Sequence, residues 1–212
     1  NEQRHQRSRR ALLLGLGAAT LLSLLQGCFP VVATGVGAGA ALVSDRRTSG
    51  TYVEDEGIEW KVSSRIRERF GNTAHINVTS YNRNVLLTGE APNATVRGEL
   101  DAIVAGVEHV RGVINEVVVG PNSALTARGN DTLITSNVKA RFVDAGRFSA
   151  HNVKVVTEAN VVFLMGIVTR AEADAAAEVA RTSQGVRKVV RVFEYISDEE
   201  ARRLDNPTGA RR

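Results

Sequence analysis

Apolar and polar residues alternate in two short segments of the chain, and a second apolar run follows each of them. The four segments are Ile76-Asn77-Val78-Thr79 with Val85-Leu86-Leu87-Thr88-Gly89, and Val153-Lys154-Val155-Val156 with Val161-Val162-Phe163-Leu164-Met165-Gly166. Alternation with a period of two is typical of a strand that buries one face. Residues that favour turns separate the two runs of each pair. The pattern therefore predicts two β-hairpins.

The two hairpins are copies of one unit, because Leu87 corresponds to Leu164 and Gly89 to Gly166, each pair 77 residues apart. A helical pattern precedes each hairpin and another follows it. The apolar positions of the preceding helices are Ile58, Val62, Ile66 and Phe70 in the first copy and Ile134, Val138 and Phe142 in the second. Residues 93–105 and the alanine-rich residues 170–183 are the following helices. Spacing of about four residues predicts one buried face on each helix.

A glycine and a run of valines close each copy. Residues 106–113 and 185–192 align at a spacing of 79, which predicts two inserted residues in the second helix or its turn. The glycine ends a helix and the valines predict a third strand. We expect an α+β fold in which each copy is α-β-β-α-β, with a three-stranded sheet packed on two helices. Units of this size are marginal alone, so the two copies should pack together.

The predicted boundaries are 58–120 for the first copy and 130–196 for the second. The charged residues 197–212 are expected to be a disordered tail or a frayed helix. Residues 28–57 are expected to be an N-terminal linker that is rich in glycine. Its apolar part, residues 31–43, either lies near a membrane surface or is a flexible tether.

The first 28 residues have the layout of an export signal. Residues 1–10 carry four arginines and one glutamate, and Ala11 to Leu25 contain no charged residue. The stretch ends in Leu25-Gln26-Gly27-Cys28, which resembles the lipobox of bacterial lipoproteins. This resemblance implies removal of residues 1–27 and lipidation of Cys28, and several acyl chains are needed for stable anchoring. Phe29, where retention signals place aspartate, favours the outer membrane over the inner one.

Removal of residues 1–27 changes the charge of the protein. The full chain has 27 basic and 23 acidic residues, and four arginines and one glutamate leave with the signal. The mature chain would then hold 23 basic and 22 acidic residues, a net charge of +1. A nucleic-acid partner loses its main support, because such proteins carry concentrated positive charge. Cys28 is the only cysteine, so it has no disulfide partner within the chain.

The order of motifs resembles the BON domain family. The segments that carry the resemblance are the alternating strands, the Val-x-Leu-x-Gly run in 85–89, the residues Asn130-Asp131-Thr132, and the Gly-Val-x-x-Val runs. Two such domains behind a lipobox resemble dual-BON outer-membrane lipoproteins. The hairpin turns differ from the family, which often has glycine where this chain has Arg83-Asn84 and Asn160-Val161. The resemblance implies a lipid-anchored protein that faces the periplasm and binds phospholipid through its second domain.

No catalytic or metal-binding motif is evident in the sequence. His75, His109 and His151 each stand alone at the edge of a predicted strand. The sequence contains no His-Glu-x-x-His, Cys-x-x-Cys or Gly-x-Ser-x-Gly motif. We therefore expect a non-enzymatic protein with no metal and no cofactor other than the covalent lipid on Cys28.

Residues 133–148 are the candidate phospholipid-binding segment. The loop after this helix is interpreted as five residues longer than in the first copy, counting from Phe142 and from Phe70. Apolar side chains next to lysine and arginine suit a helix at the surface of an anionic membrane. The candidate residues are Leu133, Ile134, Val138, Lys139, Arg141, Phe142, Arg147 and Phe148. A helix that faces the core, with its cations in solvent, is the alternative explanation of the same pattern.

Two functions follow from these observations. The first is an envelope protein that binds anionic phospholipid and supports the integrity of the envelope. The second is a scaffold that docks envelope proteins on the exposed sheet faces, including Thr79, Tyr81 and Thr88, with no lipid binding beyond the anchor. Vesicle binding by the unlipidated protein distinguishes the two.

Overall fold

A computed structural model describes residues 45–206 of the chain. The expected signal, Cys28, residues 29–44 of the linker and the last six residues lie outside the described residues. The first repeat contains α3 (Ser49–Phe70), β1 (His75–Tyr81), β2 (Asn84–Ala91), α4 (Ala94–Ala105), β3 (Gly112–Asn115) and β4 (Val118–Val119). The second contains α5 (Leu125–Ala145), the 3-10 turn η2 (Ala150–Asn152), β5 (Val153–Glu158), β6 (Val161–Val168), α6 (Arg170–Arg181) and β7 (Lys188–Tyr195), and α7 (Asp198–Asp205) follows it.

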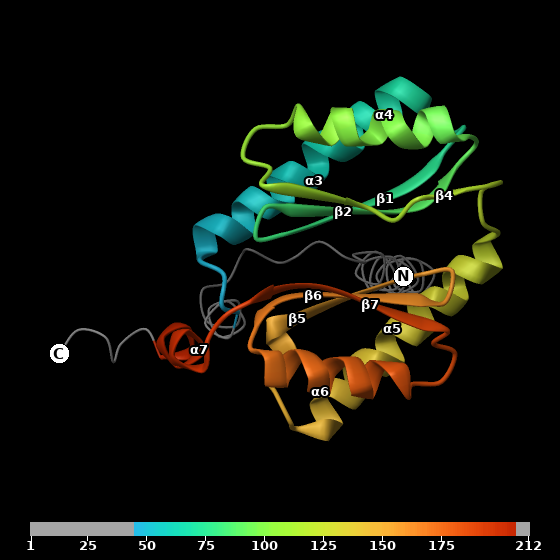
Figure 1. Cartoon of the computed structure of the whole chain (residues 1–212). Helices are drawn as coiled ribbons and strands as arrows, with labels where there is room; N and C mark the ends of the chain where they lie inside the picture. Colours follow the sequence, from blue (N-terminus) through green and yellow to red (C-terminus); the bar gives the residue numbers. More distant parts are fainter. Residues whose placement is uncertain (1–44, 207–212) are drawn as a thin grey trace, which may run out of the picture. The chain divides into compact units, whose positions relative to one another are not determined.

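Both repeats have the predicted α-β-β-α-β order. The strand order is β1-β2-β3 in the first sheet, where the short β4 also pairs with β2, and β5-β6-β7 in the second. The first two strands of each sheet are antiparallel, and the third runs parallel to the second. Figure 1 shows α3 and α4 on one face of the first sheet and α5 and α6 on one face of the second. The predicted α+β architecture is confirmed.

The helices bury the face that their four-residue spacing predicted. In the first repeat Ile58, Val62 and Ile66 of α3 pack against β2 and α4. The second repeat uses the residues 76 positions later in the same way, which are Ile134, Val138 and Phe142. A third apolar cluster joins the other faces of the two sheets, and its buried members are Tyr81, Leu86, Phe163, Met165 and Ile167. Because β2 and β6 are covered on both faces, their apolar runs are continuous.

The sheet residues expected to dock a partner are buried instead. Thr79, Tyr81 and Thr88 have 9%, 4% and 1% of their surface exposed. They lie on the sheet face that packs against the second repeat, so the prediction of an exposed docking face was wrong. Its failure follows from the packing of the two repeats against each other, which the alternating pattern of a single strand cannot reveal.

An aspartate holds each hairpin turn. The turn residues are Asn82 with Arg83 and Ala159 with Asn160, all at positive φ, one residue earlier than the sequence suggested. Asp55 accepts hydrogen bonds from the backbone N–H groups of Asn82 (2.8 Å) and Arg83 (2.7 Å). Asp131 accepts the equivalent pair at 2.9 Å each. These carboxylates offset the cost of left-handed backbone at residues other than glycine.

The third strands of the two repeats are aligned three residues away from the predicted alignment. Val85 lies opposite Val113 and Val162 opposite Val189, which makes the strands equivalent at a spacing of 76. Helices α4 and α6 both have 12 residues, so the predicted insertion is absent. The error arose because valines recur every third residue in both segments, and a shift of three residues preserves the match.

The segment from Phe142 to Val153 is one residue longer than its counterpart from Ile66 to Ile76, not five. Phe142 is buried where the first repeat has Ile66, and Val153 pairs with Gly166 as Ile76 pairs with Gly89. Counting from Phe70 compared positions that are not equivalent, so the argument from a long insertion was wrong.

Both ends of the described chain are more ordered than the sequence suggested. Helix α3 begins at Ser49 rather than at residue 58. Residues 198–205 form α7, which Ser197 caps and whose first turn is acidic. Arg46, with 2% of its side chain exposed, pairs with Asp205 at 2.8 Å and with Glu172 at 2.7 Å. Of the two alternatives for the tail, residues 198–205 therefore follow the helical one, and the expectation of disorder was wrong for them.

All three apolar clusters consist of residues between Ile58 and Leu204. A chain that starts at residue 29 therefore keeps every residue of the described cores. Such a chain is suitable for experiments in solution without the lipid anchor.

Candidate functional site

Three of the eight predicted phospholipid-binding residues belong to the core. Ile134, Val138 and Phe142 have 4%, 0% and 1% of their surface exposed. They pack under the second sheet with the alanines of α6. A membrane could reach them only if the second repeat unfolded, so these three residues are withdrawn from the site.

Two more of the predicted residues have structural contacts. Arg141 is half-buried and donates hydrogen bonds to the Val179 carbonyl oxygen at 3.1 Å and to the Ser183 hydroxyl at 2.8 Å. These bonds satisfy groups at the C-terminal end of α6, where a cation is favourable. Phe148 is half-buried and packs edge-on against Phe142, with ring centroids 4.9 Å apart. Both side chains therefore stabilise the second repeat.

The remaining three predicted residues are exposed on or beside α5. Leu133 has 71% of its surface exposed, and Lys139 and Arg147 are also exposed. Sequence reasoning missed two further apolar residues of this helix, Leu125 and Val143, which are 80% and 70% exposed. Helix α5 thus exposes three large aliphatic side chains, and apolar side chains that gather on one surface mark an interaction site.

These aliphatic residues lie on one uncharged strip of α5. At 100° per residue, Leu125 and Val143 are in line after five turns, and Leu133 lies about 80° away. The strip, called the α5 strip below, consists of Leu125, Gly129, Leu133, Ser136, Ala140 and Val143, all exposed. It runs roughly 27 Å along the helix at 1.5 Å per residue. It faces away from the core, because Ile134, Val138 and Phe142 lie on the opposite side. Locating the core positions first would have identified it.

Cations lie near the C-terminal end of the α5 strip. A cavity of about 350 Å³ there is lined by Lys139, Val143, His151 and Lys154, among others. Lys154 pairs with Glu59 at 2.9 Å, and Lys139 is exposed. An exposed aliphatic strip that ends beside lysines has the arrangement of an interfacial helix, with apolar groups toward acyl chains and cations toward headgroups.

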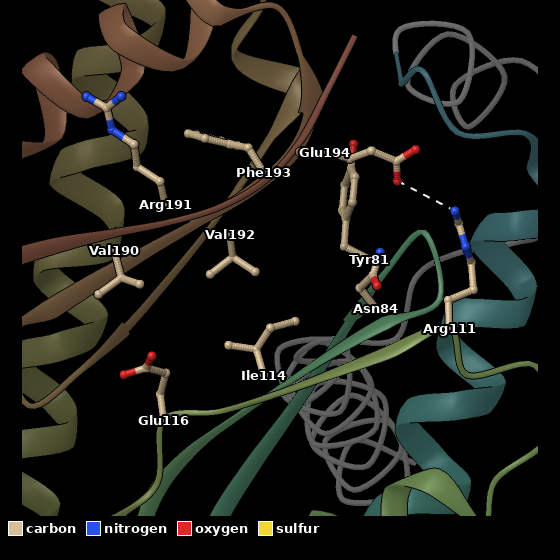
Figure 2. A pocket seen from close by; sticks show the side chains of 11 residues that line it. Tyr81, Asn84, Arg111, Ile114, Glu116, Val190, Arg191, Val192, Phe193 and Glu194 are labelled. Atoms are coloured by element: carbon tan, nitrogen blue, oxygen red, sulfur yellow. Dashed lines mark ion pairs between the residues drawn. The ribbon is translucent and has the colours of Figure 1, made fainter.

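A second hollow lies between the two sheets (Figure 2). It measures about 570 Å³, and Ile114 and Val192 extend into it from opposite sides. Its charged lining residues are Arg111, Glu116, Arg191 and Glu194. Arg111 pairs with Glu194 at 3.6 Å, and Arg191 pairs with Asp174 at 2.6 Å. Because both arginines of the lining have an acidic partner, the hollow offers an anionic ligand little attraction.

The described histidines are distributed over the fold. His75 pairs with Glu90 at 3.0 Å, and His109 pairs with Glu54 at 2.9 Å on the surface. His151 is exposed and lines the cavity beside α5. Among the helices of residues 45–206, none is both long and apolar enough to cross a membrane.

Comparisons with known proteins agree with the repeat. A family model described as BON domain matches residues 54–121 and again residues 130–197. The chain is 39% identical over 188 residues to "Outer membrane lipoprotein DolP" of Haemophilus influenzae, covering 88% of this chain and 95% of the relative. It is 38% identical over 154 residues to "21 kDa hemolysin" of Actinobacillus pleuropneumoniae, covering 72% and 79%. "Osmotically-inducible protein Y" of Escherichia coli is 28% identical over 74% of this chain and 80% of its own length.

Proposed function

The chain belongs to the BON-domain family as a dual-BON outer-membrane lipoprotein of the envelope, and from this premise we propose that it binds anionic phospholipid through the α5 strip. The role is non-enzymatic: the protein supports envelope integrity by holding its second repeat against the membrane. The observation that carries the proposal is the exposure of Leu125, Leu133 and Val143 on one uncharged face of α5.

The strip is suited to weak, reversible contact with a membrane. Full burial of an aliphatic side chain contributes about 1.5–3 kcal/mol, and three partly buried ones contribute on the order of 3–5 kcal/mol. Each lysine or arginine near an anionic surface adds about 1 kcal/mol. Lys139 and Arg147 are exposed and available for such contacts. Lipid on Cys28 would keep the strip at a high local concentration near the bilayer.

Vesicle binding tests the proposal with the chain from residue 29 onward. The vesicles contain phosphatidylglycerol in phosphatidylethanolamine, and the measurement is co-sedimentation at low and high salt. We expect binding that weakens with salt, since screening reduces the attraction between lysine and headgroup. The double change Leu133→Asp with Val143→Asp should weaken binding at least about tenfold, because carboxylates resist burial at the acyl boundary.

The first repeat supplies a matched control. Val53 and Trp60 on α3 are 70% and 72% exposed, so Val53→Asp with Trp60→Asp introduces the same charge on an equally exposed helix. This control should retain the binding of the unchanged chain. Equal loss in both double variants, or no loss in the α5 variant, would remove the α5 strip as the lipid-binding site.

The alternative proposal is a scaffold for envelope proteins with no intrinsic lipid binding. The exposed Trp60 favours it, because tryptophan is enriched at the centres of protein interfaces. A scaffold would show no vesicle binding without the anchor. It would instead yield a specific crosslinked partner that Trp60→Ala removes and Leu133→Asp leaves in place.

A further inference from the structure

A histidine and two glutamates meet at one end of the first sheet. His75 and Glu90 are directly opposite each other on β1 and β2, and His75 Nδ1 lies 3.0 Å from Glu90 Oε2. Glu158, the last residue of β5, belongs to the second repeat. One potential ligand atom of each residue lies within 4.8 Å of the others. Two regular strands and a hairpin end therefore position the three groups.

The three side chains are held in place by their surroundings. Glu90 and Glu158 are buried, with 6% and 8% of their surface exposed. Glu158 Oε2 accepts hydrogen bonds from the Asn77 amide at 2.6 Å and the Thr88 hydroxyl at 3.3 Å. Asn77 and Thr88 are themselves the cross-strand pair two residues further along. Hydrogen bonds of this kind orient carboxylates in metal sites.

Two buried carboxylates of the cluster face one imidazole. Among the described residues, no lysine or arginine forms an ion pair with Glu90 or Glu158. Of the nearby cations, Arg128 donates to the Ser123 hydroxyl and carbonyl oxygens at 3.1 Å and 3.0 Å, and Lys139 is exposed. Buried charge without a partner is costly, and one divalent cation would neutralise both carboxylates.

We propose that His75, Glu90 and Glu158 bind one zinc ion that joins the first repeat to the second. Zinc takes imidazole nitrogen and carboxylate oxygen at about 2.0–2.2 Å in a tetrahedral arrangement. Its ligand atoms then lie roughly 3.5 Å apart, so the side chains need to close by about 1 Å. Calcium and magnesium prefer six or more oxygen ligands, and an imidazole with only two carboxylates does not suit them.

The fourth zinc ligand is water from an adjoining cavity. This cavity measures about 460 Å³ and is lined by His75, Asn77 and Glu158, and by Thr135 and Ser136 of α5. It gives the ion a path of entry from solvent, and the metal remains accessible at one position. Because the ligands come from both repeats, the ion stabilises the contact between them.

Zinc should stabilise the unchanged chain but not the variant Glu158→Gln. With zinc at one hundred times its Kd, the unchanged chain should gain about 5–10 °C, and the variant should gain little. Competition with a chromophoric chelator should show one zinc ion per chain, and Glu158→Gln and His75→Ala should each weaken binding at least about 100-fold. The chain from residue 29 onward is used throughout.

The pair of His109 and Glu54 provides the control, because it has the same imidazole–carboxylate contact at 2.9 Å on the surface. His109→Ala with Glu54→Gln should leave zinc binding unchanged. Two results would overturn the proposal: absence of stoichiometric zinc binding, or binding that survives both Glu158→Gln and His75→Ala.

Discussion

Gly89→Ala is expected to lower the free energy of unfolding by about 4 kcal/mol. A Cβ at Gly89 would lie 2.0 Å from the His75 carbonyl oxygen on the neighbouring strand, and the residue has φ of +107°. Overpacking costs about 1–3 kcal/mol, and backbone strain adds a similar amount. Neither β1 nor β2 can move away, because both are fixed in the sheet. Urea denaturation followed by circular dichroism measures the loss.

The second repeat has the same requirement. A Cβ at Gly166 would lie 2.4 Å from the Asn152 carbonyl oxygen, so Gly166→Ala should cost about 2–3 kcal/mol from overpacking alone. Gly98 of α4 is the matched control, because a Cβ there meets nothing within 4 Å. Gly98→Ala should stabilise the protein by about 0.5–1 kcal/mol. Equal stability of Gly89→Ala and Gly98→Ala would show that the close approach of the strands does not constrain this position.

Asp55→Ala is expected to cost about 3–4 kcal/mol. Asp55 is 2% exposed and accepts hydrogen bonds from the Ser80 hydroxyl at 2.7 Å and from the turn N–H groups of Asn82 and Arg83. It also pairs with Arg47 at 2.9 Å. Alanine leaves the Ser80 hydroxyl and the two turn N–H groups without their acceptor, at about 1–3 kcal/mol for a buried donor, and removes one of the two acidic partners of Arg47. Thermal unfolding at pH 7 checks the loss.

Two further variants test whether the loss comes from the charge and hydrogen bonds of Asp55. Asp55→Asn keeps an oxygen for the turn but not the charge, so it should lose less stability than Asp55→Ala. Glu56→Ala changes the exposed neighbour on α3 and should fall within about 0.5 kcal/mol of the unchanged protein. A loss after Asp55→Ala no greater than after Glu56→Ala would contradict the role given to this carboxylate.

Local sequence patterns were sufficient to predict the architecture. The alternation in 76–79 and 153–156, and the four-residue spacing from Ile58 and from Ile134, predicted the strands, the helices and their buried faces. Each of these signals depends on neighbours within a few residues, and such short-range periodicity survives in the fold. The alignment of the third strands failed because valines repeat every third residue there, and only pairing with β2 and β6 fixes the register.

The sequence-based prediction identified which helix carries the candidate lipid site but not which face of that helix. The sequence placed apolar residues and cations together in 133–148. Ile134 was assigned both to the core face and to the lipid site, although the four-residue spacing already distinguished the buried Ile134 from Leu133, which is 71% exposed. Leu125 and Val143 were missed because the choice of site residues did not use the face opposite the core positions.

The sequence by itself determined the two repeats, their order of elements and the side chains available for each core, since these follow from periodicity and turn chemistry. The tertiary structure decided which sheet faces are buried, because the two repeats cover each other. It also placed Glu158 beside His75 and Glu90, three residues that carry no motif and lie up to 83 positions apart. Contacts across such separations depend on how whole sheets pack, and no local pattern of the chain encodes them.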